Sequence, residues 1–586
     1  MSAFNQISNS VSIEEDPSFP YLPPCMRCQP IIDYTTLRFH SNTIPYPVQI
    51  FNDEDSEYKF GTLDIAIRTE IPINTKHIHM FFTIDASGSM SDICSDGRTK
   101  MAHIHHTLEN MLRIFHENRE CNISVHVQAF DTIINTVIRN VPNIHDANIE
   151  ELIVLISQQI KPRGSTNIEL ALEKASEEIE SYHVANPEHE IVHIFLTDGD
   201  ITSGSRDYTH LLELVPKNCT NVFIGYGLDH DSELLSHLST EKGNEYRFVD
   251  ALEKAGLVYG EVIHSILYKA IEDVTLSASG AELYNYQTNT WSNDLEIGNL
   301  LSEQMKTFHV RSKTVDECYI SINGKTIVKT RQFQTINIYE KQTDVSPLHY
   351  LSESNDLGVY LFRQRTQELL YESRQISQFY KKSYIHDSMR DLDDYTEIES
   401  RFESLQQQQK DLKEKMKEFH KIMINYMKDK NIENNPMMKM LCDDIYIAYK
   451  TTGTTLGGMY SCARQTSNGR QQTYMCSATH TQEICGNHIR PPGILRLQRQ
   501  TNAPSIGFRE TTQVFAFDNM MPPIDQGMDN DNEIDNYAPS QDFLSPFSSD
   551  GVVTLMREVS GNHSIGRTLA DNDNDDEQEE KTNSIN

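Results

Sequence analysis

The sequence has no long apolar run and little tryptophan, with one Trp in 586 residues. No segment reaches the roughly 18 consecutive apolar residues that a membrane-spanning helix requires. The opening residues, MSAFNQISNSVSIEEDPSF, contain neither a basic start nor an apolar core, so no secretory signal is expected. We therefore expect neither membrane insertion nor secretion.

Positive charge is also scarce, with 51 Lys and Arg against 85 Asp and Glu and a formal net charge of −34. Such a surface repels the phosphates of nucleic acids and anionic lipids, so we expect neither as a partner. The ten cysteines are scattered along the chain, which suits free thiols better than a disulfide framework. These features predict a cytoplasmic protein.

The pattern of apolar residues divides the chain into regions. Apolar runs of strand length alternate with helical stretches over 77–269, which predicts an α/β domain with a doubly wound, mostly parallel sheet. Short alternating runs over 31–76 and 270–342 predict antiparallel strands. We expect these two segments to form one β-sandwich into which the α/β domain is inserted. Two separate small sheets are the alternative.

The remaining segments are helical or low in order. Residues 346–450 are expected to be helical, and within 395–426 apolar residues recur at alternating steps of three and four, as in a heptad seam. These residues are Ile398, Phe402, Leu405, Leu412, Met416, Phe419, Met423 and Tyr426, with Gln409 at the one polar position. The seam predicts either a helical hairpin within the chain or a homo-oligomeric coiled coil. Residues 1–30 are expected to be a flexible lead and 451–586 a low-order acidic tail.

Oxygen-bearing side chains follow the strands of the predicted parallel sheet. In HMFFTIDASGSMSD a buried strand ends at Asp85, and Ser87 and Ser89 come directly after it. Thr166 lies in a glycine-containing loop before a helix, and Asp198 ends another apolar strand, IVHIFLTD. Ligands of doubly wound sheets bind beyond the carboxyl ends of the strands. Carboxylates and hydroxyls there suit a small hard cation such as Mg²⁺.

The five residues and their placement resemble the von Willebrand factor type A (VWA) domain and its metal-ion-dependent adhesion site, or MIDAS. The resemblance covers about a third of the chain. It implies that Ser87, Ser89 and Thr166 bind the metal through hydroxyls, while Asp85 and Asp198 act largely through waters. It further implies a non-enzymatic protein that takes a partner's Asp or Glu carboxylate as the sixth ligand. Mg²⁺ is the expected cation, with Mn²⁺ or Ca²⁺ as alternatives.

The overall layout is similar to intracellular VWA proteins of plants, protists and large DNA viruses, some of which carry a RING finger. This chain departs from them, since only Cys25, Cys28 and His40 precede the α/β region as plausible RING ligands, and eight are needed. Ubiquitin-ligase activity is therefore not expected. If the chain is of viral origin, the virion is expected as a second location beside the cytoplasm. The alternative function is a scaffold or virion component with a structural cation that assembles through its helical region.

Overall fold

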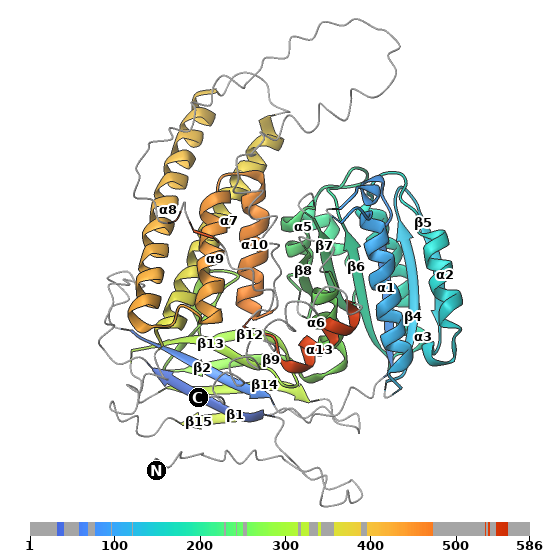
Figure 1. Cartoon of the computed structure of the whole chain (residues 1–586), viewed down its shortest axis with the longest axis horizontal. Helices are drawn as coiled ribbons and strands as arrows, with labels where there is room; N and C mark the ends of the chain where they lie inside the picture. The colour runs from blue at the N-terminus through green and yellow to red at the C-terminus, as the bar shows by residue number, and fades with distance from the viewer. Residues whose placement is uncertain are drawn as a thin grey trace, which may run out of the picture.

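The computed structural model describes residues 32–39, 58–67, 77–313 (with gaps at 95, 120, 228–229, 242 and 250–254), 318–326, 338–341, 357–387, 395–472, 534, 537–538 and 546–560. Figure 1 shows an α/β unit beside a group of long helices, with further β-sheets below the helices. The flexible lead predicted at 1–30 and the RING-type residues Cys25, Cys28 and His40 lie outside the described residues.

The α/β unit is built on a six-stranded sheet in the order β5-β4-β3-β6-β7-β8. All neighbouring pairs are parallel except β4 and the edge strand β5. The strands are β3 (Ile78–Asp85), β4 (Ile123–Phe130), β5 (Ile134–Val141), β6 (Glu190–Thr197), β7 (Thr220–Tyr226) and β8 (Glu245–Val249). All eight residues of β3 are buried, as its continuous apolar sequence requires of a strand covered on both faces.

Helices cover both faces of this sheet. They are α1 (Lys100–Glu117), α2 (Ile149–Gln159), α3 (Ile168–Ala185), α4 (Tyr208–Glu213), α5 (Ser232–Leu238) and α6 (Ala255–Leu267), with 3₁₀ turns η3 (Gly88–Ser91) and η4 (Ile144–Asp146). One apolar core joins the sheet to α1 and α6, and another joins it to α3, α4 and α5. The predicted α/β class with a mostly parallel sheet is confirmed.

The segments on both sides of the α/β unit form two antiparallel sheets, and strands from both sides meet in the first of them. One has the order β1-β2-β13-β10-β11 and the other β12-β9-β14-β15. Their bounds are β1 (Ile32–Phe39), β2 (Lys59–Ile67), β9 (Lys269–Ser279), β10 (Glu282–Asn285), β11 (Thr290–Ser292), β12 (Asp294–Leu301), β13 (Met305–Ser312), β14 (Tyr319–Thr326) and β15 (Ile338–Lys341). β2 pairs with β13 over eight residues, and both sheets contribute to one apolar core. The α/β unit therefore interrupts a β-structure formed by its two flanks.

The helical region, where the structure describes it, contains α7 (Gly358–Asp387), α8 (Tyr395–Lys430), α9 (Pro436–Thr451) and α10 (Thr455–Arg470). The heptad residues from Leu412 to Tyr426 are buried in one core with side chains of α7 and α9. Gln409, the polar position of the seam, donates from Nε2 to the Thr452 carbonyl at 2.9 Å. The described part of the seam thus packs within the chain, while the side chains of Ile398 and Phe402 lie outside the described residues.

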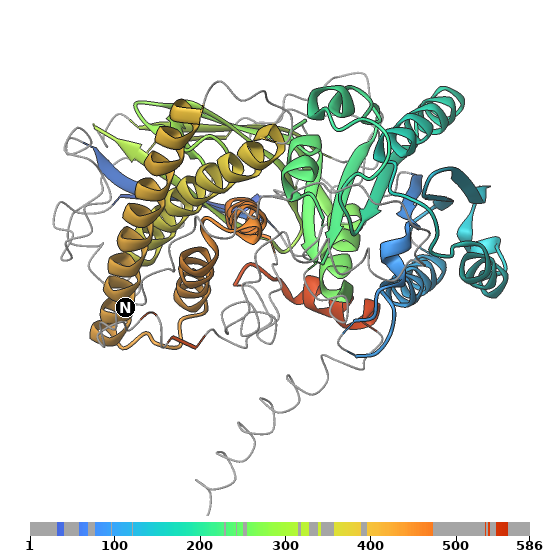
Figure 2. The same cartoon turned by 90° about the horizontal axis from the view of Figure 1, so that it is seen from above.

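The prediction of low order throughout 451–586 is wrong for two segments. α10 packs against α7, α5 and β8, and α13 (Asp550–Val559) packs against α6 and α1. Figures 1 and 2 show α13, in red, beside the α/β unit. A Cβ on Gly260 of α6 would lie 2.4 Å from the Met556 nitrogen, so the missing side chain permits the close approach of α13.

Candidate metal centre

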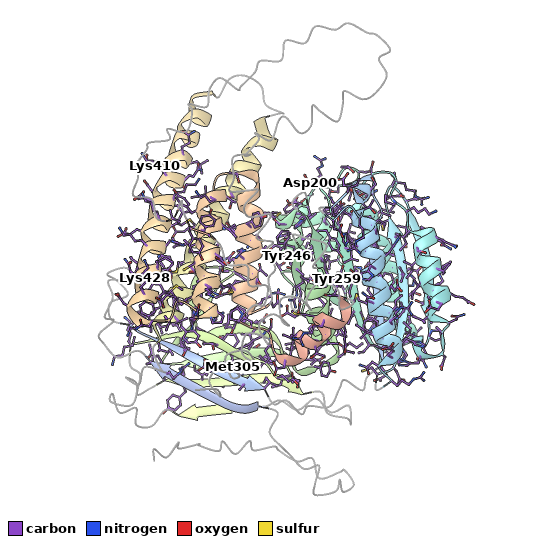
Figure 3. All side chains as sticks on the ribbon, in the orientation of Figure 1. Asp200, Tyr246, Tyr259, Met305, Lys410 and Lys428 are labelled. Atoms are coloured by element: carbon purple, nitrogen blue, oxygen red, sulfur yellow. The ribbon has the colours of Figure 1, made fainter. Side chains whose placement is uncertain are left out.

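The five predicted residues lie at the carboxyl end of the parallel sheet. Asp85 is the last residue of β3, and Asp198 directly follows the neighbouring strand β6. Ser87 and Ser89 enter η3, and Thr166 ends the loop that leads into α3. Asp200, labelled in Figure 3, marks this end of the sheet. Since parallel strands end at the same edge, segments far apart in the sequence meet there.

Asp85 is fully buried and accepts hydrogen bonds on both carboxylate oxygens. The Ser87 backbone N–H donates to Oδ1 at 2.8 Å, and the Thr197 hydroxyl donates to Oδ2 at 2.6 Å. Burial and the nearby Asp198 carboxylate raise the pKa of Asp85 to about 6, although these hydrogen bonds act in the opposite direction. Thr197 therefore orients Asp85, a role that the sequence analysis missed.

A chain of hydrogen bonds joins the serines to Asp198. Ser87 Oγ lies 2.9 Å from Ser89 Oγ, and Ser89 Oγ donates to Asp198 Oδ1 at 2.7 Å. Asp198 is fully buried, so its charge must be balanced inside the protein. Both serines and both aspartates thus belong to one connected polar cluster.

Thr166 is buried, and hydrogen bonds of its backbone fix its position. Its N–H donates to Thr202 Oγ1 at 2.7 Å, and its carbonyl accepts from the Thr202 N–H at 3.1 Å. A Cβ built on Gly199 would lie 3.8 Å from Thr166 Oγ1 and 3.7 Å from Ser89 Oγ. The hydroxyls of Thr166 and Ser89 therefore border the same small space, which a larger residue at position 199 would fill.

Lys100, which the sequence analysis did not identify, also enters the cluster. Its Nζ lies 2.7 Å from Asp198 Oδ2 and 3.8 Å from Asp92 Oδ2, and its side chain is 12% exposed. Thr197 could have been noticed as the last strand residue before Asp198. No pattern in the sequence pairs Lys100 with an aspartate 98 positions away, because the contact arises only when α1 packs beside the sheet.

These residues fit a hard divalent cation better than a soft one. The donor set consists of three hydroxyls and two carboxylates, whereas cysteine and histidine ligands would favour zinc or copper. Among the described residues, no group of three or more His, Cys, Asp or Glu side chains is arranged to hold a metal. A cation at this end of the sheet would therefore depend on hydroxyl oxygens as well as on the two aspartates.

No protein-family model and no curated protein matches the chain. Among solved structures, it resembles the ArnB paralogue VWA2 from Sulfolobus acidocaldarius, with 15% identity, a TM-score of 0.42, and 75% of this chain and 99% of the other covered. A von Willebrand factor type A protein from Catenulispora acidiphila gives 14% identity and a TM-score of 0.37, with 56% and 78% covered. PTMP1 from the mussel byssus, whose MIDAS motif is occupied by zinc, gives 17% identity and a TM-score of 0.27, with 35% and 50% covered. At these low scores, function has to be inferred from the geometry of the site.

Proposed function

We propose that the protein is a non-enzymatic protein-binding module that captures a partner's Asp or Glu carboxylate through a divalent cation, with Mg²⁺ as the first choice and Mn²⁺ or Ca²⁺ as alternatives. The hydroxyls of Ser87, Ser89 and Thr166 would ligate the ion, and Asp85 and Asp198 would balance its charge. The observation that supports this most directly is that three separate segments come together at one point, through the Ser89–Asp198 hydrogen bond and the space beside Gly199.

The charge of the site favours a carboxylate partner. Two aspartates balance the charge of a divalent ion, so the ion keeps an affinity for a further oxygen anion. The chain as a whole is strongly acidic and repels an acidic partner at long range. The expected partner surface therefore has one anchoring carboxylate surrounded by basic or polar groups.

Two exposed isoleucines add apolar area at the same end of the sheet. Ile93, in the loop after β3, is 74% exposed, and Ile133, in the turn after β4, is 55% exposed. Because both loops follow the carboxyl ends of adjacent strands, they flank the candidate metal centre. We expect an apolar side chain near the partner's carboxylate to contact one of them.

We also propose a cytoplasmic location. The layout is similar to that of VWA proteins of protists and large DNA viruses, and if the source is viral, the virion is a second proposed location. The six described cysteines, Cys94, Cys121, Cys219, Cys318, Cys442 and Cys462, are free thiols, in keeping with a reducing compartment. Among the described residues, the helices are all too short or too polar to cross a bilayer. The alternative of a scaffold assembling through the heptad segment gains no support, since its seam residues from Leu412 to Tyr426 pack against α7 and α9.

The test is affinity capture from the source lysate by the full chain, with Mg²⁺ or with EDTA, followed by mass spectrometry. We expect a set of proteins bound by the wild type in Mg²⁺ and lost both in EDTA and in Asp85→Ala. Asp411→Ala, an exposed position on α8 far from the sheet, is the matched control and should retain those proteins. Capture of the same partners in EDTA would refute the proposed function.

A further inference from the structure

Lys100 is held in place by the loop that precedes it. Its backbone N–H donates to the Asp92 carbonyl at 3.0 Å, and the Cys94 N–H donates to the Arg98 carbonyl at 2.8 Å, so two backbone hydrogen bonds tie the start of α1 to the residues that precede it. Lys100 is also the first residue of α1, where the helix dipole disfavours a positive side chain. A stronger interaction must therefore compensate, and the carboxylates around its ammonium group supply it.

The ammonium group interacts with two carboxylates at unequal distances. Asp198 Oδ2 is 2.7 Å away and Asp198 is fully buried, whereas Asp92 Oδ2 is 3.8 Å away and the Asp92 side chain is 40% exposed. Asp198 Oδ1 already accepts from Ser89, so each Asp198 oxygen has a partner. Lys100 thus supplies the positive charge that this buried carboxylate requires in the absence of a metal ion.

A divalent ion beside Ser89 and Asp198 would stand close to this ammonium group, in a buried site where like charges repel strongly. We propose that Lys100 is an internal cation that competes with the metal for Asp198 and sets the metal affinity of the site. This inference rests on the proposed metal centre. When the metal enters, the ammonium group is displaced toward Asp92, whose partly exposed carboxylate lies within reach. Metal binding is then an exchange of one cation for another.

If the two cations exchange in this way, removing the charge of Lys100 should increase the affinity of the site for Mg²⁺. Mg²⁺ titration of the full-length protein by calorimetry should show at least tenfold tighter binding for Lys100→Met than for the wild type. Lys100→Gln keeps a hydrogen-bond donor for Asp198 and guards against misfolding of the methionine variant, and it should show the same direction of change. Lys174→Met is the matched control, because Lys174 is 44% exposed on α3 and pairs with Glu177. It should bind Mg²⁺ as the wild type does.

Melting temperatures in EDTA and in Mg²⁺ supply a second measurement. We expect Lys100→Gln to melt below the wild type in EDTA, because Asp198 loses its counter-charge, and to show the larger upward shift when Mg²⁺ is added.

Equal or weaker Mg²⁺ binding by both neutral variants, with the wild type still binding, would overturn the competition alone. Failure of the wild type and both variants to bind Mg²⁺, Mn²⁺ or Ca²⁺ would overturn the competition and the proposed function together. Binding by the variants but not by the wild type would support the competition in its strongest form.

Discussion

Ser89 and Asp198 are 109 residues apart in sequence, yet the serine hydroxyl donates to the aspartate at 2.7 Å. This contact connects the loop after β3 with the loop after β6, and Asp85 is joined to the latter strand through Thr197. The backbones of β3 and β6 pair in parallel register up to Ile84 and Leu196, so the two loops leave the sheet side by side. The sheet, more than any single loop, positions the candidate metal centre.

Replacing Thr166 by valine should remove one proposed metal ligand without disturbing the loop. The hydrogen bonds to Thr202 are made by the Thr166 backbone, and valine has nearly the same shape as threonine. We expect Mg²⁺ affinity to fall by at least tenfold while the melting temperature in EDTA changes little. Calorimetry and thermal unfolding measure the two effects.

Thr166→Ser is the control for this substitution, because it keeps the hydroxyl and should retain most of the affinity. Equal Mg²⁺ binding by the serine and valine variants would remove Thr166 from the metal centre, even if the other four residues bind the ion.

The sequence predicted where the five candidate residues lie, because each follows a strand or loop whose position is fixed by local pattern, while metal binding by them stays a prediction. It could not predict Lys100, whose role depends on how α1 packs. It also failed for α10, where residues 457–468 are all buried, so no alternation of apolar and polar faces marks the helix. Polar side chains inside α10 are instead satisfied by partners such as Asp444, which forms an ion pair with Arg464.

Buried histidines in the central sheet should make the fold sensitive to acid. Burial lowers the pKa of His193 to about 4 and that of His79 to about 3, with His126 contributing to both shifts by charge repulsion. The unfolded chain binds protons near pH 6.5, so the folded state loses stability as the pH falls from 6.5 toward 4. For the fully buried His193 the loss amounts to about 3 kcal/mol at 1.36 kcal/mol per pKa unit.

Urea unfolding at pH 8 and pH 4 measures this loss. His193→Gln replaces the ring by an amide that can still bond Thr83 and Asn221, and it should reduce the difference in unfolding free energy between the two pH values. His210, which is 41% exposed beside Glu169, serves as the control when changed to Gln. An unchanged pH dependence in His193→Gln would show that other groups cause the acid sensitivity.

The heptad seam should stabilise the monomer rather than a dimer. Met416 is fully buried among residues of α7 and α9, so Met416→Ala should lower the free energy of unfolding by about 2–5 kcal/mol, as buried Met-to-Ala changes do. Light scattering after size exclusion should give the monomer mass for both proteins. A melting temperature that rises with protein concentration, and loses this dependence in Met416→Ala, would instead indicate assembly through the seam.

Gly260→Ala should release α13 from the α/β unit while leaving α6 intact. Alanine favours a helix over glycine by about 1 kcal/mol, so α6 itself should not be weakened. The added methyl carbon would lie 2.4 Å from the Met556 nitrogen and 2.5 Å from its Cα, too close for α13 to stay in place. Amide hydrogen exchange should therefore increase across 550–559 but not across 255–267. Gly458→Ala in α10, whose Cβ would meet Ser377 Cβ at a tolerable 3.4 Å, should leave both segments protected. If exchange across 550–559 is as slow in Gly260→Ala as in the wild type, the position of α13 does not depend on the missing side chain at Gly260.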